Sequence, residues 1–331
     1  MKLGIFLLLV VIISKCDSQD DFDVFSLIHP ISSMTQQTVT RNVTIVGRNF
    51  GRLWPKQLSR NIQGYTFIRC TFNRTRMSAD MRGTTFEKCN FTGITINSPR
   101  IYNAVFIDCL ISNTRFNWGS MLGSKFIRTH FHTTEFSRAS FTKTMLVNSS
   151  MTNCTFSWSD FSGSYVKNSK FSNLSLGWQN YRGAKLVDSD YSSLDLGIMD
   201  LRNATIVNCN FSHSNISWAK FQRSKIFHSN FCNTDISWGK FSGSLIVNTT
   251  FCNCDLSWPT FDGSFGPTTV LYGNFSMCSL SWLDVGKSVF MHTDFRGSGV
   301  SRARLSRARL VNVTFTQTSS RVYRPFWIDF S

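Results

Sequence analysis

Histidine, cysteine and acidic residues would carry catalysis or metal binding, and their spacing in this chain favours neither. The six histidines are scattered, and no His or Cys arrangement has the spacing of a known metal site. Cys252 and Cys254 resemble a metal pair, but the five-residue repeat of this chain points their side chains to opposite sides. Asp235 and Asp255 are the best candidate acids, and we interpret them as solvated residues of one face. We therefore predict no enzyme, no metal site and no cofactor.

The cysteines and tryptophans follow a period of twenty residues. Cys232 and Cys252 are twenty apart, both follow an apolar residue by one, and this spacing suits a disulfide. The cysteines expected to point inward are either small core residues or disulfide bridges between coils. Without Cys16, which lies in the N-terminal segment, the number of cysteines is odd, so at least one thiol is left over unless it pairs between chains. These inward cysteines are Cys70, Cys89 and Cys109 in one column and Cys254 and Cys278 in another.

Seven of the nine tryptophans belong to one column. One interpretation is a self-stacking ladder that stiffens a corner, with Arg138 and Arg302 stacked on its ends. The other is an aromatic stripe that binds sugar rings or another protein. The column reads Trp118, Arg138, Trp158, Trp178, Ile198, Trp218, Trp238, Trp258, Trp282 and Arg302.

A bulky apolar residue recurs at every fifth position, as in Phe126, Phe131, Phe136 and Phe141. We call this residue the centre, and the residue two before it is small (Ser124, for example). A period of five suits neither a strand nor a helix, and it is typical of a solenoid whose stacked units share one core. On one side, Gly or Asn two residues after the centre indicates a turn with positive φ.

The repeat resembles the pentapeptide-repeat family, whose unit reads A-[DN]-[LF]-x-x. It stands here as Ala79-Asp80-Met81, Cys89-Asn90-Phe91 and Cys209-Asn210-Phe211, and Ser, Thr or Cys often replaces the small Ala. The resemblance implies an all-β fold, a right-handed quadrilateral β-helix. From the length of the repeat region and the need to cover the open end of a solenoid, we expect about twelve coils with an N-terminal cap. At the level of fold it is similar to the lumenal domain of synaptic vesicle glycoprotein 2.

The flanking segments lack the repeat. Residues 1–18 read as a secretory signal peptide. We assign residues 19–64 to the N-terminal cap, residues 65–315 to the repeats, with a four-residue insertion near 265–269, and residues 316–331 to a C-terminal tail or cap. No other stretch is long and apolar enough to span a bilayer, so we expect a secreted, extracellular protein.

The formal net charge is +16, which favours an extracellular acidic glycan or protein as partner; export argues against nucleic acid. The densest basic group is Arg302, Arg304, Arg307 and Arg309. Outward-facing glycosylation sequons support a secretory route. They lie at Asn42, Asn73, Asn90, Asn148, Asn153, Asn173, Asn203, Asn210, Asn215, Asn248, Asn274 and Asn312.

Two functions fit these observations. The first is a non-catalytic structural or matrix scaffold, a glycosylated rod that self-assembles. The second is an extracellular recognition module that binds a protein or acidic glycan through the tryptophans Trp158 to Trp282 and the basic C-terminal end.

Overall fold

The computed structural model describes residues 43–51, 62–74, 80–176, 178–305 and 307–316. The chain divides into two units, residues 1–38 and 39–331, and the whole of the first lies outside the described residues. The expected signal peptide, Asn42 and residues 317–331 also lie outside them. All regular structure in the described residues is β-strand.

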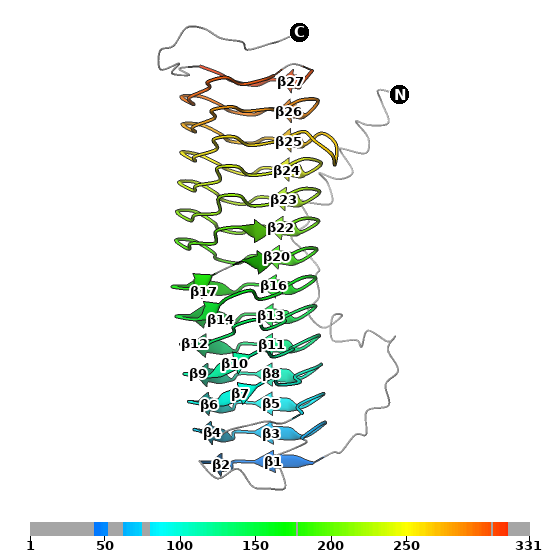
Figure 1. Ribbon diagram of the computed structural model, residues 1–331, viewed down its shortest axis with the longest axis vertical. Coiled ribbons are helices and arrows are strands. Elements are labelled where there is room, and N and C mark those ends of the chain that lie inside the picture. Colours follow the sequence, from blue (N-terminus) through cyan, green and yellow to red (C-terminus); the bar gives the residue numbers. More distant parts are fainter. Residues whose placement is uncertain (1–42, 52–61, 75–79, 177, 306, 317–331) are drawn as a thin grey trace. The chain divides into compact units, whose positions relative to one another are not determined.

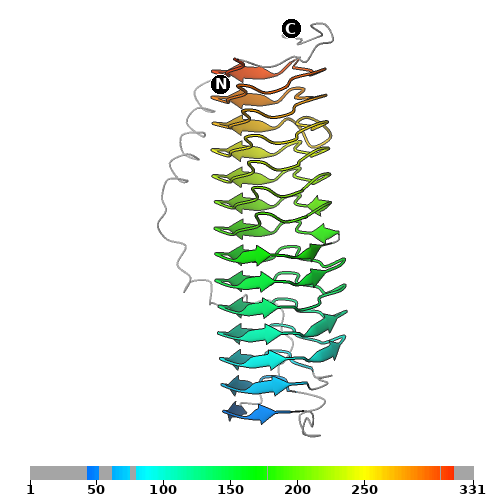
Figure 2. The same ribbon diagram turned by 90° about the vertical axis from the view of Figure 1, so that its left-hand side faces the viewer.

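The repeats wind into coils of about twenty residues, and each coil has four faces. We number the faces in chain order: residues 105–107 lie on the first face, 110–112 on the second, 115–117 on the third and 120–122 on the fourth. Each numbered corner follows the face of the same number. Figures 1 and 2 show the coils stacked one above another.

The first face is a parallel fourteen-stranded sheet with one strand from each coil. Neighbouring strands align residue for residue, as in Phe106 opposite Phe126 and Phe126 opposite Leu146. Its strands, in order, are β1 (Thr44–Val46), β3 (Thr66–Ile68), β5 (Thr85–Glu87), β8 (Val105–Ile107), β11 (Lys125–Ile127), β13 (Met145–Val147), β16 (Tyr165–Lys167), β20 (Lys185–Val187), β22 (Thr205–Val207), β23 (Lys225–Phe227), β24 (Leu245–Val247), β25 (Thr269–Leu271), β26 (Val289–Met291) and β27 (Arg309–Val311).

The other three faces have shorter sheets that continue as isolated parallel bridges. The second face has seven strands: β2 (Asn49–Phe50), β4 (Thr71–Asn73), β6 (Asn90–Thr92), β9 (Leu110–Ser112), β12 (His130–His132), β14 (Ser150–Thr152) and β17 (Lys170–Ser172). The third face has β7 (Thr95–Asn97), β10 (Arg115–Asn117), β15 (Thr155–Phe156) and β18 (Ser175–Leu176), and the fourth has β19 (Gln179–Asn180) and β21 (Met199–Asp200). The all-β solenoid expected from the repeat is thereby confirmed: the thirteen first-face strands from β3 to β27 span about twelve turns, and β1 adds one coil before them.

The centres form the core. Phe131, Phe211 and Phe231, whose exposure would have contradicted the register, are at most 1% exposed. Where neighbouring coils both have an aromatic centre on one face, the rings stack: the ring centroids of Phe211 and Phe231 are 4.9 Å apart with an interplanar angle of 3°. Aromatic centres thus make columns of offset-stacked rings along the axis, which adds to the burial of apolar surface.

The small position explains why this chain so often has Ser or Thr where the family unit has Ala. The Ser159 hydroxyl donates to the carbonyl of Phe136 at 2.7 Å, and the Thr234 hydroxyl donates to the carbonyl of Phe211 at 2.9 Å. Both bonds join one coil to the coil before it. A buried hydroxyl that makes this bond carries no unpaired-donor penalty, whereas the hydroxyls of Ser164 and Ser224, at the same position in other coils, have no partner among the described residues.

The turn with positive φ recurs at all four corners, whereas the sequence indicated it at one. The fourth corner has the expected Gly and Asn, as in Gly183 and Asn203. Equivalent positions at the third corner include Trp218 (φ 63°) and Arg138 (φ 56°). Bonds between coils, such as Trp218 N–H to the carbonyl of Ser237 at 2.8 Å, fix this backbone regardless of residue type. A left-handed conformation costs about 1–2 kcal/mol for a residue with a Cβ.

The solenoid begins inside the segment expected to be a cap. Strand β1 pairs with β3 and β2 pairs with β4, and Ile45 and Phe50 occupy centre positions. Ile45 faces Phe67, which is 22 residues later rather than 20, so this first coil is out of phase with the main repeat. The change of phase explains why the repeat could not be followed upstream of residue 65.

The inserted residues lie between Phe261 and Thr268. Thr268 already occupies a small position, and β25 pairs in register with β24. Phe265 of the loop is 39% exposed, and the guanidinium of Arg223 lies 4.8 Å from its ring centroid. The loop carbonyl of Phe265 passes close to Gly243, where an added Cβ would come within 2.5 Å of it. The loop therefore folds back over the preceding coils.

Candidate binding surface

The tryptophan column forms the third corner, two residues after each third-face centre. Trp158, Trp218, Trp238, Trp258 and Trp282 have φ values between 59° and 63°. At this corner the side chain leaves the coil outward, and the residues remain 38–62% exposed. Large aromatic residues this exposed on one edge are uncommon on a surface without a binding role.

The tryptophan rings stack face to face. Trp218, Trp238, Trp258 and Trp282 form one block with successive centroid distances of 4.8, 5.0 and 4.4 Å and interplanar angles of 0–12°. The guanidinium of Arg302 continues this block, 4.4 Å from the Trp282 ring centroid. These four tryptophans and Arg302 are called the tryptophan ladder below.

Four further members of the column lie on the other side of a gap. Trp158 stacks on Trp178 at 5.7 Å, and Arg138 lies 4.4 Å above the ring centroid of Trp118. Ile198 separates this group from the ladder, in a coil where Gly197 rather than residue 198 has positive φ. The turn has shifted by one residue there, so the aromatic column is broken.

Stacking decides which part of each ring a partner can reach. Both ring faces of Trp238 and Trp258 are covered by neighbouring rings, and Trp282 lies between Trp258 and Arg302. A sugar ring that stacks on an aromatic ring needs an open ring face. From Trp238 to Trp282 only ring edges and indole N–H groups remain available, which fit the side chains of a protein better than a sugar ring.

The third face beside the ladder is polar. The backbone N–H groups of Ser237 and Ser257 each donate to the carboxylate two residues before, Asp235 or Asp255, at 2.9 Å. These acids therefore stabilise the turns of their coils. No group of three or more His, Cys, Asp or Glu residues in the described part of the chain could hold a metal ion.

The basic residues of the C-terminal end share one coil but not one face. Arg302 is at the third corner, Arg304 on the fourth face, Arg307 at the fourth corner and Arg309 on the first face. All four side chains are exposed. The ion pairs of the described residues include none of them. They form a band around part of the coil rather than the single patch that their spacing suggested.

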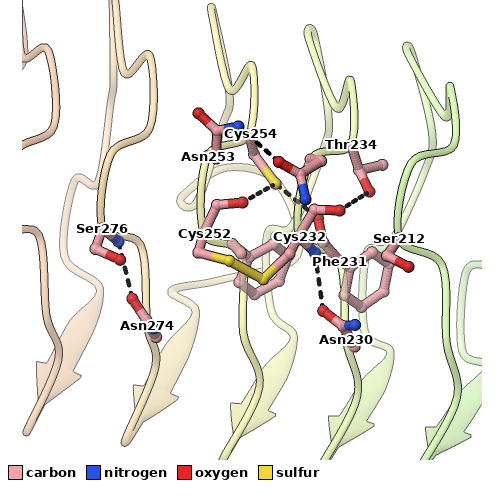
Figure 3. Close-up of a disulfide and its surroundings, with 12 residues drawn as sticks. Ser212, Asn230, Phe231, Cys232, Thr234, Cys252, Asn253, Cys254, Asn274 and Ser276 are labelled. Carbon is pink, nitrogen blue, oxygen red and sulfur yellow. Dashed lines mark hydrogen bonds between the residues drawn. A yellow bond between two sulfur atoms is a disulfide. The ribbon is translucent and has the colours of Figure 1, made fainter.

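Cys232 and Cys252 form a disulfide on the second face, with their Cα atoms 4.6 Å apart (Figure 3). The bond joins two adjacent coils. Among the described residues the other cysteines are unpaired and buried, namely Cys70, Cys89, Cys109, Cys154, Cys209, Cys254 and Cys278.

The buried thiols occupy small positions, like the serines and threonines. The Cys89 thiol donates to the carbonyl of Phe67 at 3.4 Å. Burial raises the pKa of Cys154 to about 11 and that of Cys209 to about 12, so these thiols stay protonated at neutral pH. A protonated, inaccessible thiol is a poor nucleophile, so these cysteines serve the core.

The sequons within the described residues have exposed or half-buried Asn side chains. Corner positions hold Asn148, Asn153, Asn173, Asn203, Asn248 and Asn312. The second face holds Asn73, Asn90, Asn210 and Asn274, and the third holds Asn215. The Asn173 amide donates to the Asn153 side-chain oxygen at 2.5 Å, which places these two acceptor sites side by side.

This geometry defines a repeat protein of the β-solenoid class. The family described as pentapeptide repeats (8 copies) matches residues 134–173. These residues of the chain therefore consist of pentapeptide repeats. No curated protein sequence matches it.

Several solved structures are similar. QnrB1, a plasmid-mediated fluoroquinolone resistance protein, is 16% identical over 68% of this chain and 91% of that one, with a TM-score of 0.30. HetL, a pentapeptide-repeat protein involved in heterocyst differentiation regulation in the cyanobacterium Nostoc, is 12% identical over 84% and 91%, with a TM-score of 0.21. The alginate lyase AlyF-OU02, solved with G6, is 11% identical over 84% and 79%, with a TM-score of 0.40.

A pentapeptide-repeat protein from the Arabidopsis thaliana thylakoid lumen is 19% identical over 30% of this chain, with a TM-score of 0.27, and the match spans 66% of that chain. Within the described residues, none of the secondary structure is a helix with the length and hydrophobicity needed to cross a membrane.

Proposed function

We propose that this protein is a secreted, N-glycosylated and non-catalytic recognition module that binds a partner protein through the exposed edge of the tryptophan ladder. The observation that carries the proposal is the ladder itself. Its tryptophans stay 38–48% exposed in consecutive coils, at a corner where Gly or Asn would satisfy the backbone at lower cost. Exposed aromatic residues that are kept at one corner despite the free-energy cost of their left-handed backbone favour a binding role.

Export is supported by three features of the chain. They are the apolar N-terminal segment, the sequons with outward Asn side chains, and the disulfide between Cys232 and Cys252. Disulfides persist in oxidising compartments and are rare in the cytosol. Immunoblotting of culture medium before and after deglycosylation tests the proposal; a full-length, unglycosylated protein confined to the cytosol would contradict it.

Binding can be tested with an array of extracellular proteins probed by the purified chain. The test variant is Trp218→Asn/Trp238→Asn/Trp258→Asn, because Asn occupies the same left-handed position at other corners, as at Asn203. The control is His213→Asn at the second corner. We expect the triple variant to lose the array signals and the control to keep them; equal binding by both would leave the ladder a stiffening role only.

A scaffold role is the second candidate, and one observation favours it. The buried core runs without interruption from Phe50 to Leu305, so each coil stiffens its neighbours. A matrix scaffold requires open-ended assembly, which sedimentation would detect as polymers that grow with concentration.

The basic band suggests a third test, directed at acidic glycans. Because Arg304, Arg307 and Arg309 are exposed and lack ion pairs among the described residues, we expect retention on a heparin column. Replacing the three with Gln should lower the salt needed for elution; unchanged elution would exclude this band as the heparin site.

A further inference from the structure

The outer surface of the first face differs from the other three. In each strand the centre points inward, and the residues before and after it point outward. From β20 to β27 the residue after the centre is apolar in every coil: Val187, Val207, Phe227, Val247, Leu271, Met291 and Val311. We call these seven residues the apolar column. The same position on the third face is serine in most coils (Ser217, Ser237, Ser257, Ser281 and Ser301).

The column is partly covered but not enclosed. Phe227, Val247 and Leu271 are 4–9% exposed, and the other four members are half-buried. In the described strands, each inner member has an apolar neighbour in the coil on either side, because the strands pair in exact register. Together they make a continuous apolar ridge on a flat sheet, and such a face is stable when another layer covers it.

In these seven strands, from β20 to β27, charge is confined to the other outward column. The residue before the centre is Lys185, Lys225 or Arg309 in three of these seven coils, with no acidic residue among the seven. Cations and apolar residues therefore lie along opposite edges of the same strands. We call the residues before the centre in these seven strands the cation column. Direct superposition of the cation column on itself would be repulsive, whereas superposition of the cation column on the apolar column would not.

A second copy of the chain satisfies this arrangement. A twofold axis parallel to the solenoid axis places coil against coil and reverses the strand direction, so the cation column of one copy covers the apolar column of the other. Lysine stems then pack on the aliphatic ridge while the ammonium groups reach solvent at the edge. Any other partner would need an equally long, flat and apolar surface.

The area suits a stable interface. Fourteen strands spaced by about 4.8 Å and three residues wide give a face of roughly 60 by 10 Å, or about 600 Å², and the seven strands that carry the apolar column supply about half of it. Standard interfaces bury about 800 Å² on each partner, so the first face supplies about three quarters of such an area.

We propose that this protein is a homodimer in which two solenoids pack side by side through their first faces. The sheets lie about 10 Å apart, as in sheet-on-sheet packing. None of the sequons in the described residues lies on the first face, although Asn148, Asn203, Asn248 and Asn312 flank it at corners. The tryptophan ladder, at the third corner, stays outside the interface, so each dimer presents two ladders.

Sedimentation of the purified full-length protein tests the dimer. The variant is Val187→Lys/Val207→Lys, since Lys167 already occupies the same outward position in β16 and shows that the fold accepts lysine there. The matched control is Ser172→Lys/Ser192→Lys, the equivalent positions on the second face. We expect a wild-type dimer, a control dimer, and a variant whose dimer is weakened on the order of a hundredfold, because each new lysine replaces an apolar contact and the lysine at 187 would face Lys185 of the other copy.

Far-UV circular dichroism checks that each variant folds. If the lysine variant fails to fold, Val187→Thr/Val207→Thr keeps the shape and should still weaken the dimer. A monomeric wild type at micromolar concentration would overturn the proposal. So would a dimer or polymer that the folded lysine variant leaves unchanged, since the contact would then use another face.

Discussion

Replacing Trp238 and Trp158 separately with Asn measures what the stacking of the tryptophans contributes to stability. Both residues have almost the same backbone conformation, with φ values of 61° and 60°, so relief of left-handed strain is equal in the two variants. Trp238 has a stacked ring on each side and is 40% exposed, whereas Trp158 has one stacked ring, Trp178 at 5.7 Å, and is 62% exposed.

The expected difference follows from the covered area. A buried tryptophan covers up to about 250 Å², so Trp238 buries roughly 55 Å² more than Trp158. At about 25 cal/mol per Å² this is worth roughly 1.4 kcal/mol, and the additional stacked pair adds about 0.5–1.5 kcal/mol. Trp238→Asn should therefore destabilise the protein by about 2–3 kcal/mol more than Trp158→Asn.

The assay is urea unfolding followed by far-UV circular dichroism, with His213→Asn as the control for a corner substitution without stacking. The control should leave the midpoint nearly unchanged. Equal midpoints for the two tryptophan variants would refute the reasoning, because they would show that ring stacking does not stabilise the corner. A larger loss for Trp158→Asn would refute it as well.

Three further predictions test the register. Gly183→Ala and Gly243→Ala both force a Cβ into a left-handed backbone position, at about 1–2 kcal/mol each. Only the Cβ at position 243 would also meet the inserted loop, at 2.5 Å, so the melting temperature of Gly243→Ala should fall further. Equal losses in the two variants would contradict the loop contact. Phe211→Ala removes a fully buried ring and should cost about 3–5 kcal/mol in denaturant unfolding, and a loss below about 1 kcal/mol would show that the ring is not in the core. Glycopeptide mapping should find Asn153 and Asn173 rarely glycosylated on the same molecule, because their side chains are hydrogen-bonded neighbours, and full occupancy at both would contradict that placement.

The repeat itself could be predicted from the sequence, because an apolar residue at every fifth position suits neither a single helix nor a single strand and is typical of a solenoid. The centres, the small positions and the pairing of residues twenty apart follow from that period. Trp238 and Trp258 were therefore expected to be neighbours, and so were Cys232 and Cys252, and the structure places both pairs side by side. The start of the solenoid could not be read, since Ile45 and Phe50 are out of phase with the later coils.

Other properties depended on how neighbouring coils pack. The left-handed turn at all four corners is set by hydrogen bonds between coils, so it occurs at Trp218 and Arg138, where local residue preferences would not predict it. Sequence spacing placed the tryptophans in a column but could not tell whether their ring faces were open, because that depends on side-chain orientation. The chain alone thus determines which residues become neighbours, since the period fixes the register; the packed coils decide which surfaces of those neighbours remain accessible to a partner.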